Sequence, residues 1–273
     1  MRDLLNKYRR HLTNYNSALA YSLLGIIGGV ASGLVVLAFE LAIQELAGVW
    51  GVGGGGDDFE ALPRWALFAL PAGGATLLGI AYAMLKPKAR ETGIVHVISR
   101  MHSHYGVLPL RNAIVQFAGG AFALATGQSG GREGPGVHLG GAVNSQLGQR
   151  LGLPNNSLRI LIACGTAGGI SAAFNTPLAG VVFAMEVIVA EYTVVGFTPV
   201  LLAAISATTL THAVTGNFME LSVPDVALTS LLELPSILLL GVIMGGVAGG
   251  FSWLLRQSLR LSKQPVWLRF TLV

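Results

Sequence analysis

Charged residues are scarce in this chain, and cysteine is almost absent. Only 11% of the 273 residues are Asp, Glu, Lys or Arg, and 52% are apolar, whereas soluble domains carry about 25% charged residues. Too little charge is present to cover a soluble surface, so the composition predicts an integral membrane protein. The single cysteine, Cys164, excludes an internal disulfide, and its apolar surroundings predict a buried core residue.

Signatures of nucleotide, nucleic-acid and metal binding are also missing. The glycine-rich stretch 127–143 lacks the Gly-Lys-Ser/Thr of a phosphate loop, and basic residues form no patch, so nucleic acid is not an expected partner. His96, His102 and His104 lie close together without a Cys or carboxylate cluster. We therefore expect a polar cytoplasmic connector there, no metal site, and, without a nucleophile–base pair, no enzyme.

Two long apolar segments alternate with charged flanks. Residues 18–49 and 65–85 are each long enough to cross a bilayer, which takes about 20 residues. Basic residues precede the first segment, within a predicted amphipathic helix at 1–16, and follow the second at 86–90. The positive-inside rule therefore places the N-terminus in the cytoplasm, and we expect a multi-pass protein of the cell (inner) membrane.

The later apolar segments are short or interrupted by polar residues, glycine and proline. Segments of this kind are typical of discontinuous membrane helices around a buried site. The segments concerned are residues 113–127, 136–152, 158–175, 177–191 and 194–215.

Two glycine-rich segments resemble each other: LLGIIGGVASG at 23–33 and LLGVIMGGVAGG at 239–250. Basic residues precede the first and follow the second, so the two helices should run in opposite directions, as in an inverted-topology repeat. Because the second repeat has barely begun at Val273, we expect the front part of a longer protein. The predicted divisions are a cytoplasmic helix (1–16), a first membrane repeat (17–216), an extracytoplasmic loop (217–234) and the start of a second repeat (235–273).

An arginine and a glutamate stand side by side in the least charged part of the chain. Glu133 follows Arg132 within GREGPG, where the glycines and Pro135 are typical of a helix start. A charged side chain costs about 2.5–3.5 kcal/mol at the centre of a membrane helix, so it needs a partner or a function. Because helix N-termini stabilise anions, Glu133 predicts an anion site that its carboxylate can fill. The alternative is an acidic cap, with Arg132 pairing with a carboxylate or holding the loop.

Three motifs resemble those of the CLC family of chloride channels and chloride/proton antiporters: GREGP at 131–135, AAFNTPLAG at 172–180, and RETGIVHV at 90–97, where that family has its pore loop. The resemblance implies an all-α CLC-type fold with inverted repeats and broken helices, here with the second repeat truncated. It implies a homodimer, formed through helices in 177–215, in which each subunit moves chloride through the lipid bilayer. No cofactor is implied, since chloride is the transported ion.

The resemblance also implies roles for particular residues. Glu133 corresponds to the gating glutamate, whose carboxylate competes with chloride and leaves when it is protonated. The pore loop and the start of the Glu133 helix would bind the anion. The expected anion-binding residues are Thr92, Gly93, Ile94, Arg132, Gly134, Pro135, Gly136 and Val137.

One departure from the family pattern bears on proton coupling. Where the antiporters have two adjacent glutamates, this chain has Glu186 and Val187. A valine cannot carry a proton, so we expect passive chloride conduction unless Glu186 or Glu191 substitutes. A chloride/proton antiporter and a non-conducting membrane scaffold are the alternatives, and we expect the chain alone not to conduct selectively. His138 either tunes a pH response or packs against a neighbouring helix.

Overall fold

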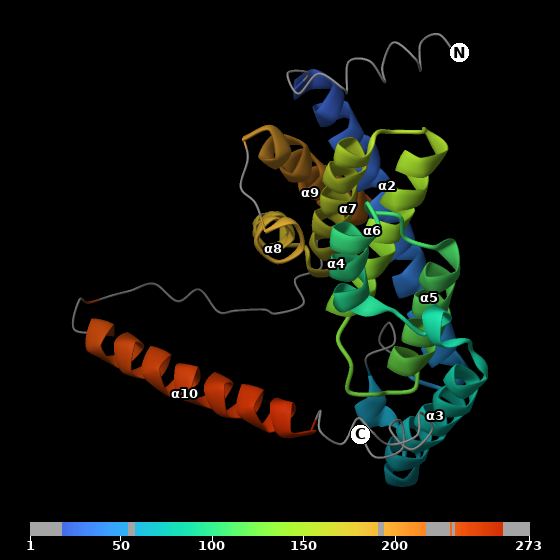
Figure 1. The fold of residues 1–273 in the computed structure, drawn as a ribbon. Helices are drawn as coiled ribbons and strands as arrows, with labels where there is room; N and C mark the ends of the chain where they lie inside the picture. The colour runs from blue at the N-terminus through green and yellow to red at the C-terminus, as the bar shows by residue number, and fades with distance from the viewer. Residues whose placement is uncertain (1–17, 54–57, 191–193, 217–229, 231–232, 259–273) are drawn as a thin grey trace.

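The structure is a computed structural model that describes residues 18–53, 58–190, 194–216, 230 and 233–258, and these are almost entirely helical (Figure 1). Five helices are long and apolar enough to cross a membrane, so the chain is a multi-pass membrane protein. These are α2 (Ala18–Val49), α3 (Arg64–Met84), α7 (Asn155–Phe174), α9 (Val194–Thr215) and α10 (Leu234–Ser258). The shorter helices are α4 (Gly93–Ser103), α5 (Leu110–Ala125), α6 (Glu133–Arg150) and α8 (Pro177–Phe183). A π-helix at Ala184–Val189 continues α8.

The predicted break after residue 175 is confirmed. Asn175 adopts a left-handed backbone conformation with φ 54°, which ends α7. Pro177 then begins α8 at the first helical position, where its missing N–H costs no hydrogen bond. The predicted helix at 1–16 and Glu191 lie outside the described residues, as does most of the predicted loop 217–234.

Helix α7 forms the centre of the bundle, and its backbone comes directly against the backbone of α6. A Cβ atom placed on Gly140 of α6 would overlap the carbonyl oxygen of Gly165 in α7, and one on Gly169 would overlap that of Gly136. These positions therefore require glycine, because only the absence of side chains lets the two helices approach so closely. This glycine contact with α7 fixes the position of the first turns of α6.

The polar residues of α6 are bonded inside the bundle. Asn144 is fully buried, and its Nδ2 atom donates to the Gly28 carbonyl (3.0 Å) and to Ser32 Oγ (2.8 Å) of α2. Ser32 Oγ in turn donates to the Gly165 carbonyl of α7 (3.1 Å). The predicted half-polar segment 136–152 is thus a core helix whose polar groups join α2, α6 and α7.

The two repeated glycine segments have different surroundings. In α2, Gly25 and Gly29 lie directly against the backbone of Pro199 and Ala203 in α9. In α10, the matching Gly241 and its neighbours have no other atoms within 4 Å of an added Cβ. Figure 1 shows α10 lying apart from the bundle. Its apolar side chains are exposed within the described protein. Among the described residues, only the first copy therefore has its packing partners in place.

Candidate functional site

Helices α4 and α6 lie side by side and begin at the same end of the pair (Figure 1). Near their starts, His96 of α4 bonds to His138 of α6 (Nδ1 to Nε2, 2.8 Å). Farther along, the Ser145 hydroxyl of α6 donates to the carbonyl of Gly106, just past the end of α4 (2.7 Å). The contacts keep the same order along both helices, so α4 and α6 run in the same direction. Their N-termini, each carrying about half a positive charge, therefore lie at one level.

The start of α4 is formed by Thr92 and Gly93. Gly93 has φ +76°, a conformation that favours glycine, and a Cβ added there would meet nothing within 4 Å. Thr92 is half-buried, its Oγ1 lies 3.5 Å from the Arg90 carbonyl oxygen, and its side chain is hydrogen-bonded to Tyr82 of α3. The first amides of α4, including that of Ile94, have no intrahelical acceptor because they lie in the first turn. The open space beside this turn leaves them accessible.

The start of α6 is at Glu133, as the sequence predicts. Its side chain is exposed, and its carboxylate folds back over Gly131, where it occupies the space that a Cβ would need. Gly134 faces open space. The Gly136 amide already donates to the Arg132 carbonyl oxygen (2.8 Å). Among the predicted anion-binding residues of α6, Gly134 therefore has a backbone amide without an intrahelical acceptor. Pro135 has no backbone N–H, and Val137 is fully buried.

Arg132 lies against α2, with Nη1 3.9 Å from Glu40 Oε1. Both side chains are largely buried, at 27% and 19% exposed, so this ion pair is screened less than a surface pair. The geometry favours the alternative in which Arg132 pairs with a carboxylate and holds the loop. Sequence reasoning missed Glu40, although an acid inside an apolar span was itself a signal.

The expected proton-pathway residues are distant from the helix starts of α4 and α6 in the sequence, but the π-helix that carries them contacts α4. Glu186 and Val187 belong to the π-helix that follows α8, and both are exposed. The stretch leaves a carboxylate and a valine next to each other on the surface of the described bundle. Glu191 lies outside the described residues.

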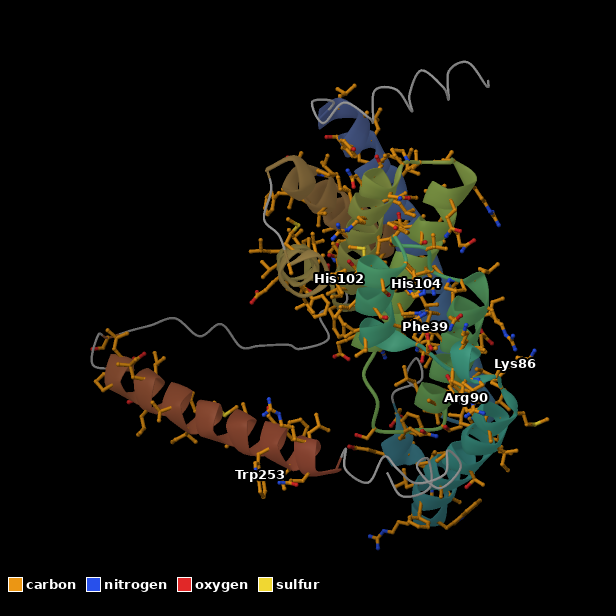
Figure 2. All side chains as sticks on the ribbon, viewed as in Figure 1. Phe39, Lys86, Arg90, His102, His104 and Trp253 are labelled. Atoms are coloured by element: carbon orange, nitrogen blue, oxygen red, sulfur yellow. The ribbon has the colours of Figure 1, made fainter. Side chains whose placement is uncertain are left out.

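The interpretation of 96–104 as a polar connector is wrong for its first part. Residues 93–103 form α4, and His96 is buried against fully buried His138. His102 and His104 are exposed, as Figure 2 shows at the far end of α4. Within the described ranges, no group of three or more His, Cys, Asp or Glu side chains could hold a metal ion. Cys164 is fully buried, as predicted.

Comparison with known proteins agrees with this architecture. A family profile described as "Voltage gated chloride channel" matches residues 74–273. The chain is 30% identical over 258 residues to a protein of Vibrio cholerae serotype O1 described as the H(+)/Cl(-) exchange transporter ClcA, covering 93% of this chain and 54% of that protein. It is 31% identical over 233 residues to a putative chloride channel protein, ClcB-like, of Ralstonia nicotianae, covering 82% of this chain and 53% of that one.

Solved structures give the same result for the fold. The structure matches that of a CLC-type fluoride/proton antiporter with a TM-score of 0.74 and 26% identity, covering 91% of this chain and 61% of the other. It matches a slow cyanobacterial Cl-/H+ antiporter with a TM-score of 0.73 and 22% identity, covering 92% and 61%.

The chain is thus a membrane protein of the CLC fold class, with interrupted membrane helices. The chain belongs to the voltage-gated chloride channel family, the CLC family. It spans about half the length of the curated relatives it matches.

Proposed function

We propose that the protein carries chloride across the membrane along a pathway lined by the starts of α4 and α6 and gated by Glu133. The observation that carries this proposal is the shared level of the two N-termini, with Glu133 at the first position of α6. Two helix ends of the same sign attract an anion to the space beside them. A membrane segment otherwise poor in charge has a carboxylate at this point.

The Glu133 carboxylate is the internal competitor for that space. When ionised, it is held near the free amides of the first turn and excludes a second negative charge. When protonated, it loses this attraction, and chloride takes its place. The glycines beside Glu133 support this proposal, because they present no side chains that would hinder movement of the carboxylate, which is folded back over Gly131.

The remaining polar residues of the loops hold these groups in position. On the α4 side, Thr92 offers a hydroxyl donor to the anion, in addition to the amides of Gly93 and Ile94. On the α6 side, the ion pair between Arg132 and Glu40 ties the loop to α2. Arg132 therefore adds positive charge near the pathway while its guanidinium is engaged with a carboxylate.

We propose passive conduction as the mode of transport because Val187 cannot bind a proton. A second candidate is chloride/proton exchange, which is favoured by the description of the Vibrio cholerae relative as an H(+)/Cl(-) exchange transporter. In that case Glu186, which is exposed one residue earlier, is the group that would relay protons. Proton uptake measured alongside chloride flux separates the two modes.

We also propose a homodimer in the inner membrane, with the N-terminus in the cytoplasm. The exposed face of α8 and α9 carries large apolar side chains, including Leu178, Val182 and Ile205. Such a face packs against lipid or against a second copy, and the second copy is the assignment that the CLC resemblance implies.

Chloride efflux from liposomes that contain the full-length protein tests the proposal. Glu133→Gln keeps the shape of the side chain and removes its charge, so we expect chloride efflux to lose its dependence on pH. As the control, Glu45→Gln removes an exposed carboxylate from a different helix, α2, and should leave the pH dependence unchanged. Nil flux in both the wild type and Glu133→Gln would support the scaffold alternative instead.

A further inference from the structure

An apolar groove of about 390 Å³ lies between α3 and α5. Its walls include Leu77 and Leu78 from the second half of α3, Leu85 just past the end of α3, and Val115 and Phe122 from α5. The α5 wall of the groove contains two small residues, Ala118 and Gly119, which present almost no side chain to α3 and so leave space beside it. Helix α3 is little buried by the rest of the described protein, so the groove opens on the face of the bundle.

One end of this groove is basic. Lys86 and Lys88 follow the last apolar residues of α3, and both are exposed. The Nδ2 atom of Asn112 donates to the Lys88 carbonyl oxygen (2.8 Å), which ties the first turn of α5 to this loop. Exposed Arg111 precedes Asn112 in that turn. The three cations therefore stand at the end of the groove where Leu85 and Val115 lie.

Two other charged residues near this end already have partners. The Arg90 guanidinium donates to the carbonyl oxygens of Ala83 and Leu85 (2.8 Å each), so it closes the end of α3. Figure 2 shows Lys86 and Arg90 near each other at this end of α3, beside α5. Glu91, the acid of this loop, lies 3.8 Å from His96 Nε2, toward α4. The net charge at this end of the groove is therefore positive, because one carboxylate, that of Glu91, stands against the three cations Lys86, Lys88 and Arg111.

The groove and the cations match the two parts of a phospholipid. Helix α3 has 21 residues, about 30 Å at 1.5 Å per residue, which is the thickness of the hydrocarbon layer. Its basic end therefore stands at the headgroup level while the groove lies at acyl-chain depth. Basic pockets between membrane helices bind anionic headgroups, and the first turn of α5 adds free amides that favour phosphate.

We propose that this groove holds an acyl chain of an anionic phospholipid whose phosphate lies among Lys86, Lys88 and Arg111. The cations confer the preference for an anionic headgroup. The groove by itself does not discriminate between lipids, because lipid tails are as apolar as its walls. Binding at this site does not depend on whether the protein transports chloride.

The groove also reaches a residue that contacts the start of α4. Tyr82 forms part of the groove wall and is hydrogen-bonded to Thr92. The hydroxyl oxygen of Tyr82 lies 2.6 Å from the position that a Cβ atom on Gly119 would occupy. A lipid tail in the groove therefore packs against the residue that holds the Thr92 side chain.

Native mass spectrometry of the delipidated, full-length protein tests the proposal. The probes are phosphatidylglycerol and phosphatidylcholine with identical acyl chains, and inorganic phosphate alone. We expect phosphatidylglycerol adducts to persist at least several-fold more than phosphatidylcholine adducts. The combined substitutions K86Q, K88Q and R111Q should abolish this preference, whereas R64Q, at the opposite exposed end of α3, should keep it.

A second variant tests the groove separately from the charges. Ala118→Trp fills the groove and leaves every cation in place, so phosphatidylglycerol adducts should fall several-fold. Ile114→Trp, at an exposed position of α5 outside the groove, should have no effect. Size-exclusion profiles check that each variant is folded.

Three results would overturn the assignment. The first is a phosphatidylglycerol preference that survives the triple substitution. The second is unchanged adduct formation in Ala118→Trp, which would mean that another part of the protein fills the groove or that the lipid binds elsewhere. The third is binding of inorganic phosphate equal to that of the lipid.

Discussion

His96 Nδ1 lies 2.8 Å from His138 Nε2, and this bond joins the two helices whose first turns form the candidate anion site. Both side chains are buried, with 5% and 0% exposed. The ring centroids lie 5.1 Å apart, and the ring planes are inclined by 31°. A buried imidazole pair of this kind shares one N–H between two ring nitrogens, so it fixes the relative position of α4 and α6 without adding charge.

The pair predicts a difference between two substitutions of His138. Leu at this position leaves the His96 nitrogen buried without a partner, at a cost of about 1–3 kcal/mol, so the unfolding temperature of the detergent-purified protein should fall. Gln offers an amide that can bond to His96, and its unfolding temperature should lie close to that of the wild type. Equal unfolding temperatures for both variants would mean that the bond does not stabilise the fold.

The glycine contact between α6 and α7 predicts a strict size limit. Gly140→Ala places a methyl group on the Gly165 carbonyl oxygen, and forcing the helices apart should destabilise the protein by about 1–3 kcal/mol. Gly73→Ala is the control, because an added Cβ there meets nothing within 4 Å. Thermal unfolding should distinguish them, and an unaltered midpoint in Gly140→Ala would contradict the close packing.

The ion pair between Arg132 and Glu40 predicts non-additive effects. Arg132→Gln and Glu40→Gln each remove one side of this largely buried ion pair, so each should be destabilising. The double substitution removes both charges and should be less harmful than the sum of the two, with a coupling of about 1 kcal/mol. A double-mutant cycle on unfolding midpoints measures this coupling, and strict additivity would show that the two side chains act independently.

Val187 leads to a prediction about proton coupling in the proposed chloride pathway. Val187→Glu introduces a proton-binding group beside Glu186, and we expect proton movement accompanying chloride flux to increase. The measurement is proton uptake by liposomes under a chloride gradient. Val187→Gln is the matched control, because it adds a polar side chain that does not titrate. Strong coupling already present in the wild type would instead favour exchange by the unmodified protein.

The long membrane helices and the break between α7 and α8 could be predicted from the sequence. The residues 18–49 match α2 because length and hydropathy alone determine a simple span. The break follows from Asn175 and Pro177, whose backbone preferences act locally. The position of Glu133 at a helix start could be predicted for the same reason.

Features that depend on distant contacts could not be predicted. Helix α4 is short and mixes apolar with polar residues, so its sequence resembles a surface connector until His138 is known to face His96. The ion pair of Arg132 with Glu40 joins residues 92 positions apart (132 − 40) in the sequence. Glu40 stands out as an acid within an apolar span, but no local pattern indicates that Arg132 is its partner. The burial of Asn144 likewise depends on distant acceptors in α2, the Gly28 carbonyl and the Ser32 hydroxyl.

The central claim, that the Glu133 carboxylate occupies space that an anion can take, is tested most directly by bromide. Crystals of the wild type and of Glu133→Gln grown in bromide would be compared by anomalous diffraction. The account predicts an additional bromide peak in Glu133→Gln beside the first turns of α4 and α6, where the carboxylate of the wild type excludes it. Identical bromide positions in the two proteins, or no bromide beside these turns in Glu133→Gln, would contradict the claim.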